Sequence, residues 1–299
     1  MSFLGHFLGS TFNVIFLILS AFLLGLSWKN KQCKAYNVTF LIHRISKLAY
    51  TYYPFLILMF VFLAFTGYHI GIKDWLMHIF FLPWFDKLPG FGHLWFVTMI
   101  VFCYVGVYMI SKFSSNMLTI VKSGGVILAV FSQFILGMTS LPNYVCIYLI
   151  LYLLVFLNAK EMLEWSNKIP AIPMLIVCCV VLPIIVSSYY FGLMNKFTSV
   201  WGGMISAILI FSLLNKLFSK AKENIIISFI SSISFEIYLV HHVFCFGKFS
   251  LFEIVENPII GIMVILSFSI VLAYFLHLIS MEISTCFIKK HDNHIKHKP

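Results

Sequence analysis

Ionisable side chains interrupt an apolar stretch near the end of the chain, in the segment Ser231-Ser-Ile-Ser-Phe-Glu-Ile-Tyr-Leu-Val-His-His242. A carboxylate (Glu236), a phenol (Tyr238) and two imidazoles (His241 and His242) therefore fall on an expected membrane-spanning helix. A charged group in the membrane costs about 2.5–3.5 kcal/mol on insertion scales and usually serves a function. An imidazole with a pKa near 6.5 can take a proton from a hydroxyl and return one to a leaving group. The segment is therefore our first candidate for an active site.

Glu236 lies about halfway along the apolar run 225–246, roughly 17 Å from its inner end at a rise of 1.5 Å per residue. Its carboxylate must pair, stay protonated or face water. As an anion it could orient an imidazole or bind an acceptor hydroxyl. The alternative is a local hydrogen bond to Ser232, four residues earlier on the same helical face. Ser234 and Tyr238 are candidate substrate-binding residues on the same segment.

The composition places these groups in an integral membrane protein. The chain is 61% hydrophobic and 10% charged, with a mean hydropathy of +1.00, far outside the range of soluble domains. We expect an all-α polytopic bundle of about nine transmembrane helices, because runs of about 20 apolar residues span a bilayer. The nine candidate spans are 7–28, 48–68, 94–111, 123–140, 143–157, 171–190, 200–214, 225–246 and 258–283.

The positive charges of the connecting loops predict the orientation. Lysine and arginine mark the cytoplasmic side, and 16 of the 20 basic residues fall in one alternating set of loops. We therefore expect an outside N-terminus and a cytoplasmic C-terminus. Residues 1–288 form one membrane domain in this interpretation, and 289–299 form a polar cytoplasmic tail. The net charge of +10 follows from the asymmetry and requires no nucleic-acid partner.

Metal and phosphate-loop signatures do not occur in the sequence. The seven cysteines are scattered without a C-x-x-C pair, so we expect neither a metal site nor a disulfide framework. No G-x-x-x-x-G-K-[ST] motif occurs. We expect no bound cofactor.

Two loops have distinctive compositions. The basic loop 29–47 contains a second half, 37–47, that is suited to an interfacial amphipathic helix. The loop 69–92 carries Trp75, Trp84, Pro83, Pro89 and Gly90, and its stretch 74–83 is too short to span a membrane. This loop either caps an active site or contributes to an aromatic belt at the membrane interface.

Four segments occur in the order found in one known family. They are Asn13–Leu24, His43–Tyr50, His93–Phe96 with Tyr104 eight residues on, and the C-terminal segment Ser231–His242. Together they resemble the acyltransferase-three family of membrane proteins, which O-acetylate surface sugars. The resemblance covers most of the chain. It implies acyl transfer, with acyl-CoA as the donor.

The family element near the first basic loop implies a donor site. Arg44 matches the family's first arginine, and Lys47 replaces its second. Arg44 is the only arginine in the chain, and a guanidinium binds phosphate through a rigid fork. The resemblance implies that Arg44 and Lys47, one helical turn apart, bind the phosphates of cytoplasmic acyl-CoA. The alternative is that both are anchors at the lipid headgroups.

The family's first helix, which carries an arginine and a presumed catalytic histidine, has no counterpart in this sequence. His93, His241 and His242, together with Glu236, are therefore the candidate catalytic residues, as substitutes for that base or as supporting groups. The alternative is that each histidine is an interfacial or hydrogen-bonded residue. Trp95 and Tyr104 are further candidates for substrate binding, although aromatic residues near interfaces also form belts.

We expect a membrane O-acyltransferase of the bacterial cytoplasmic membrane, most simply an O-acetyltransferase. It would transfer an acyl group from acetyl-CoA or another acyl-CoA to a hydroxyl of a surface or lipid-linked glycan. Its partners would be membrane lipid, acyl-CoA and the glycan acceptor. Two alternatives stay open: a truncated, inactive relative that binds glycan or lipid, and a glycan polymerase or flippase.

Overall fold

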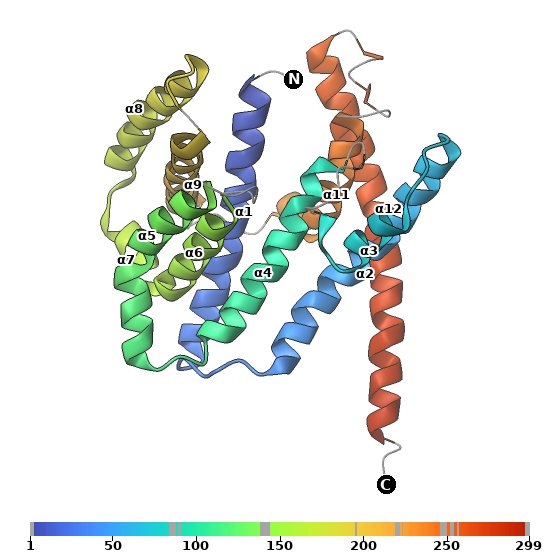
Figure 1. Ribbon diagram of the computed structural model, residues 1–299, viewed down its shortest axis with the longest axis horizontal. Helices are drawn as coiled ribbons and strands as arrows, with labels where there is room; N and C mark the ends of the chain where they lie inside the picture. Colours follow the sequence, from blue (N-terminus) through green and yellow to red (C-terminus); the bar gives the residue numbers. More distant parts are fainter. Residues whose placement is uncertain are drawn as a thin grey trace. The chain divides into compact units, whose positions relative to one another are not determined.

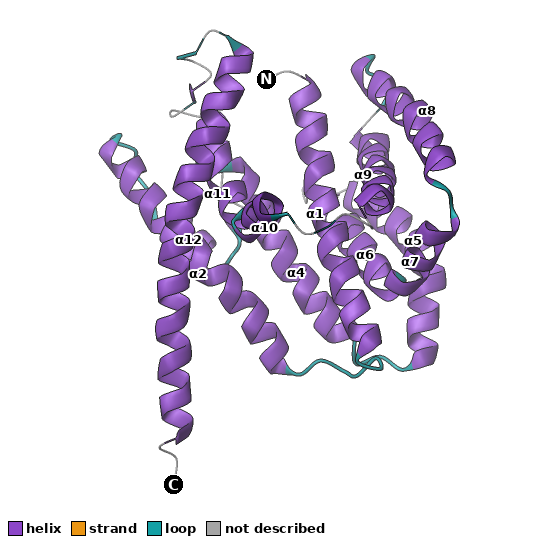
Figure 2. Ribbon diagram, turned by 180° about the vertical axis from the view of Figure 1, so that it is seen from behind, coloured by secondary structure: helices purple, strands orange, loops and turns teal. Residues whose placement is uncertain are grey.

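The computed structural model describes residues 3–83, 88, 91–137, 144–194, 196–218, 222, 224–245, 250–251, 254–255 and 257–296. All regular elements among these residues are helical (Figure 2). The elements are α1 Phe3–Asn30, α2 Val38–Phe65, α3 Ile72–Ile79, η2 Gly92–Leu94, α4 Trp95–Ile110, α5 Ser115–Gly137, α6 Tyr144–Leu157, α7 Ala159–Lys168, α8 Ala171–Tyr190, α9 Lys196–Phe218, α10 Ile225–Ser232, α11 Ser234–Cys245 and α12 Pro258–Lys296.

Membrane-spanning helices dominate the fold. Seven of the described helices are long and apolar enough to cross a bilayer, and two bent helix pairs raise the number to nine if each counts as one span. The first bent pair is α6 with α7, and the second is α10 with α11. The prediction of an all-α polytopic bundle with about nine spans is confirmed.

The helices form two compact units. Unit 1 comprises Met1–Val38 and Phe102–Lys222, and unit 2 comprises Thr39–Val101 and Glu223–Pro299. Unit 1 therefore contains α1 and α5–α9, and unit 2 contains α2, α3, η2 and α10–α12, while α4 begins in unit 2 and ends in unit 1. In Figure 1 the chain is coloured along its sequence, from blue at the N-terminus to red at the C-terminus.

Unit 1 is built around α1, which packs on α6, α7 and α9. The hydroxyls of Ser20 and Tyr152 lie 2.9 Å apart and join α1 to α6. Close approach requires glycine at position 25, since a Cβ added there would lie 2.2 Å from the carbonyl oxygen of Phe156. Small residues at such contacts allow neighbouring membrane helices to pack backbone against backbone.

The segment 158–170, interpreted as a loop from its sequence, contains the helix α7. This helix turns by 72° from α6 and carries polar side chains. Its Glu161 pairs with Lys29 at 3.1 Å and with Lys122 at 2.9 Å. Three segments that the charge pattern assigns to one side of the membrane therefore meet in unit 1.

Unit 2 is built around α11, which packs on α12 and contacts η2. The hydroxyls of Thr51 in α2 and Ser280 in α12 lie 2.9 Å apart, and both side chains are buried. The segment 37–47, expected as a separate interfacial helix, is continuous with the span in α2. The last helix, α12, continues through Lys296 and so includes most of the expected polar tail.

The short helix α3 packs against α2 rather than extending away from it. The hydroxyl of Tyr52 lies 3.0 Å from Nδ1 of the buried His78, and Tyr53 donates to the carbonyl of Ile79 at 2.8 Å. Burial lowers the pKa of His78 to about 4, and the nearby carboxylate of Asp74 opposes part of this shift. Trp84, Pro89 and Gly90, which the sequence pattern singled out in this loop, lie outside the described residues.

The expected continuous helix over 225–246 is wrong, because the segment bends by 68° between α10 and α11 at Ile233. The reason is local. The hydroxyl of Ser232 donates to the carbonyl of Phe229 at 2.7 Å, and that of Ser234 donates to the carbonyl of Ser231 at 2.9 Å. Serine hydroxyls that bond to carbonyls of the preceding turn favour such breaks and satisfy backbone groups that the bend exposes.

Candidate active site on helix α11

Three imidazoles and a phenol gather where α11 meets η2 at the start of α4. The buried ring of His93 stacks on His242, with centroids 4.3 Å apart and 24° between the planes. The centroid of Tyr238 lies 5.4 Å from that of His93, and the centroid of His241 lies 6.1 Å from it. Four of the predicted site residues are therefore brought together in one cluster, which we call the imidazole cluster.

Reciprocal hydrogen bonds hold the imidazole cluster in place. Nε2 of His93 bonds to the carbonyl of Leu239 at 3.0 Å, and the hydroxyl of Tyr238 donates to the carbonyl of His93. Nδ1 of His241 bonds to the carbonyl of Ile237 at 3.0 Å. Since a carbonyl oxygen can only accept, each of these ring nitrogens must carry a proton. The lone pair of the neutral ring is then on Nδ1 of His93 and on Nε2 of His241.

Glu236 lies on the side of α11 that faces α12. Its carboxylate oxygen Oε1 accepts a hydrogen bond from Nδ1 of His277 in α12, at 2.9 Å. The Glu236 side chain is 6% exposed, whereas that of His277 is 23% exposed. Glu236 therefore orients an imidazole of another helix, and its expected alternative partner Ser232 bonds to Phe229 instead.

The bend at Ile233 changes the setting of Glu236. The sequence placed this residue halfway along a span, whereas the structure places it in the first turn of α11. The N-terminal end of a helix carries a partial positive charge, which favours a carboxylate in the first turn. Discontinuous membrane helices use the same effect to hold anionic groups within the bilayer. The break therefore provides a physical reason for an acidic residue inside the membrane.

An apolar cavity of about 800 Å³ lies between α2, α11 and α12 within unit 2. Its wall includes Val240, one turn after Glu236, and Leu276, the residue before His277. On α2 it extends from Pro54 to Phe62. This cavity is suited to an apolar chain, because its lining consists of aliphatic and aromatic side chains.

The remaining predicted site residues lie outside the imidazole cluster or at its edge. Arg44 is half-buried on α2, with its guanidinium carbon 5.7 Å from the ring centroid of Phe40, and Lys47 is exposed one turn later. Trp95 is half-buried at the start of α4. Ser234 lies at the helix break, two residues before Glu236, and its hydroxyl donates to the carbonyl of Ser231. Tyr104 is buried on the part of α4 that belongs to unit 1.

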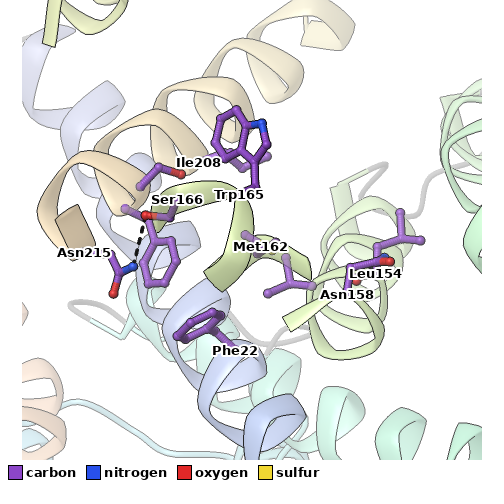
Figure 3. Close-up of a pocket in the computed structure, with 11 residues that line it drawn as sticks. Phe22, Leu154, Asn158, Met162, Trp165, Ser166, Ile208 and Asn215 are labelled. Carbon is purple, nitrogen blue, oxygen red and sulfur yellow. Dashed lines mark hydrogen bonds between the residues drawn. The ribbon is translucent and has the colours of Figure 1, made fainter. Parts of the chain in front are cut away.

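A second cavity, of about 300 Å³, lies in unit 1 between α1, α6, α7 and α9. Figure 3 shows the amide of Asn215 directed at the hydroxyl of Ser166, with 3.3 Å between donor and acceptor. The other labelled side chains around this cavity are mostly apolar, among them Phe22, Met162 and Trp165. None of the lining residues ionises near neutral pH, so this cavity offers no general base.

His277 was not among the site residues predicted from the sequence, and its contact with Glu236 gives it a place in the site. A signal was present, since an ionisable side chain inside a long apolar run marks a functional candidate. Among the residues that the structure describes, no three His, Cys, Asp or Glu side chains are arranged to hold a metal ion.

The fold and the site define a polytopic membrane protein with ionisable side chains buried between its spans. Residues 1–278 match the profile of the acyltransferase 3 family, described as an acyltransferase domain. The match covers most of the chain, so the protein belongs to this family of membrane acyltransferases. The search of curated proteins and the search of solved structures each found no match.

Proposed function

We propose that the protein transfers an acyl group, most simply acetyl, from cytoplasmic acyl-CoA to a hydroxyl of a surface or lipid-linked glycan. The observation that carries this proposal is the imidazole cluster, built from two segments far apart in the chain of an acyltransferase. Ring nitrogens at this helix contact, where His93 is buried and His241 and His242 are half-buried, suit the binding and polarisation of a hydroxyl group. In this assignment His93, His241 and His242 hold the acceptor, and Tyr238 fixes the position of His93.

The donor would be held at the other end of unit 2. Arg44 and Lys47 are one turn apart near the start of α2, a helix of 28 residues. Since about 20 residues cross the hydrocarbon, such a helix extends into the headgroup region, where phosphate groups of acyl-CoA are soluble. A guanidinium binds phosphate in a bidentate manner, and lysine adds a point charge. The proposed orientation places this end, and the C-terminus, on the cytoplasmic side.

The family membership favours acyl transfer over the polymerase and flippase alternatives. The proposal locates the protein in the bacterial cytoplasmic membrane, where both acyl-CoA and lipid-linked glycans are accessible. A hydroxyl acceptor is supported by the imidazoles, because a ring nitrogen can accept a hydrogen bond from a hydroxyl or donate one to it.

The test supplies acetyl-CoA, labelled in the acetyl group, to bacterial membranes that contain the protein. We expect label in the glycan fraction, and we expect mild alkali to release it because O-acetyl esters are labile to base. Membranes without the protein are the control, and acetyl-CoA labelled in the adenine ring should leave the glycan unlabelled. Incorporation no greater than in the control membranes would contradict the proposed function, and binding of acetyl-CoA without transfer would favour an inactive relative.

A further inference from the structure

His277 differs from the other histidines of the site in the kind of group that orients it. Its Nδ1 bonds to a carboxylate at 2.9 Å, whereas the described bonds of His93 and His241 are to backbone carbonyls. A carboxylate that accepts from Nδ1 fixes the tautomer and leaves the lone pair on Nε2. It also stabilises the imidazolium that forms when Nε2 takes a proton. This arrangement is suited to a general base.

The two partners have the exposures that this role requires. Glu236 is nearly inaccessible and sits in the first turn of α11, where the helix dipole favours its negative charge. His277 keeps 23% of its side chain accessible. The lining of the apolar cavity includes neither member of the pair, but it includes Val240, one turn after Glu236, and Leu276, the residue before His277. Water-poor surroundings of this kind strengthen electrostatic interactions during a reaction.

The contact between α2 and α12 relates His277 to the proposed donor site. The two helices run in opposite directions within unit 2, as Figure 1 shows. Thr51 contacts Ser280, and Tyr50 stacks on Phe287 at 5.6 Å between centroids, so the start of α2 lies beside the C-terminal half of α12. At 1.5 Å per residue, Arg44 and His277 are about 15 Å apart along the helix axes.

We propose that His277 is the general base of acyl transfer and that Glu236 is its positioning residue. This inference rests on the proposed function. Nε2 of His277 takes the proton of the acceptor hydroxyl while the hydroxyl oxygen attacks the carbonyl carbon of the acyl-CoA. The new C–O bond forms as the C–S bond breaks, and CoA leaves as a thiolate. The imidazolium then returns the proton to the thiolate, so His277 ends the cycle neutral.

Two substitutions separate the proposed roles. His277→Ala removes the base, so kcat for labelled acetyl transfer should fall by about 10²–10⁴-fold, the usual contribution of such a group. Added imidazole should restore part of this rate, because it can occupy the space left by the ring. Glu236→Gln keeps the shape of the side chain but removes its charge. It should lower kcat while leaving KM for acetyl-CoA near that of the parent protein.

Ser280→Ala is the matched control. It removes the buried hydrogen bond to Thr51 one helical turn from His277 and leaves the dyad intact. At equal abundance in the membrane we expect its kcat to stay within about twofold of the parent value, because a structural contact does not enter the rate of a folded enzyme.

The outcomes distinguish this inference from the function on which it rests. An active parent protein whose His277→Ala variant transfers acetyl at the parent rate would overturn the role of His277 alone. His277 would instead be structural if added imidazole does not restore the activity of His277→Ala and if both His277→Ala and His277→Gln are less abundant in the membrane than the parent protein. A parent protein that transfers no acetyl would overturn the proposed function and this inference together.

Discussion

The imidazole ring of His93 lies stacked on that of His242, with 4.3 Å between centroids and 24° between planes. Two imidazolium ions in this position would repel each other strongly. The stack leaves ring nitrogens of both residues at the contact between α11 and η2. It also fixes the rotation of α11, and thereby directs Glu236 toward α12.

The stacked pair predicts different effects for two substitutions of His242. His242→Phe keeps an aromatic ring, and such pairs contribute about 0.5–1.5 kcal/mol. It should therefore preserve abundance while raising KM for the glycan acceptor, since the ring nitrogens are lost. His242→Ala should lower both abundance and activity. Initial rates of labelled acetyl transfer at varied acceptor concentration measure the effect. If His242→Phe has the KM and kcat of the parent protein, the stacked pair does not form part of the acceptor site.

Arg44 is predicted to bind the donor. Arg44→Ala should weaken acetyl-CoA binding by about tenfold or more, because hydrogen bonds to charged groups contribute about 1.5–3 kcal/mol. Arg44→Lys should recover only part of the affinity, since an ammonium group cannot bind phosphate in a bidentate manner. Calorimetric titration of acetyl-CoA into protein held in nanodiscs gives the affinity. Lys29→Ala, at a lysine of unit 1 that pairs with Glu161, is the control. Unchanged affinity in both Arg44 variants would leave Arg44 as a headgroup anchor.

The free energy of unfolding should decrease as the pH is lowered, because of His78. Burial lowers its pKa to about 4, below the value of about 6.5 expected when α3 separates from α2. Between these values the opened state binds more protons than the native state. Stability is therefore full above pH 6.5 and declines as the pH falls toward 4.

Thermal unfolding in detergent at pH 7.5 and pH 5 measures this decline. The His78→Gln variant should show a smaller difference between the two pH values than the parent protein. Equal differences in both proteins would show that another group controls the pH dependence.

Gly25 should tolerate no larger residue. A Cβ at this position would meet the carbonyl oxygen of Phe156 at 2.2 Å, so Gly25→Ala must push α1 away from α6. Overpacking of this kind costs about 1–3 kcal/mol. Gly9→Ala, on the same helix, adds a Cβ with no neighbour within 4 Å and serves as the control. We expect a lower unfolding temperature for Gly25→Ala than for Gly9→Ala, and equal temperatures would contradict the close packing of α1 on α6.

The proposed orientation predicts a cytoplasmic C-terminus. A reporter fused after Pro299 should be active if it functions in the cytoplasm and silent if it functions only outside the membrane. The same reporters placed after Ser140, in a loop expected outside, should give the opposite pattern. An externally active reporter at Pro299 would invert the assignment of Arg44 to the cytoplasmic side.

The sequence by itself determined which segments are apolar and long enough to cross a membrane, but it indicated neither the helix α7 nor the break at Ile233. Hydropathy and length are local properties, so they also singled out Glu236 as an acidic side chain inside a span. The family segments were recognisable for the same reason, since each is a short run of residues such as His93–Phe96. The membership found from residues 1–278 agrees with that resemblance.

Only the tertiary structure decided which residues meet. The spans are apolar around most of their circumference, so no amphipathic stripe indicates which face contacts a neighbour. The pairing of Glu236 with His277, and of His93 with His242, depends on how α11 and α12 are rotated and how far each is shifted along its axis. The bend at Ile233 determines where α11 begins, and it thereby places Glu236 in the first turn of a new helix. The pattern of residues along one chain segment contains neither the rotation of a helix relative to its neighbour nor its shift along the helix axis.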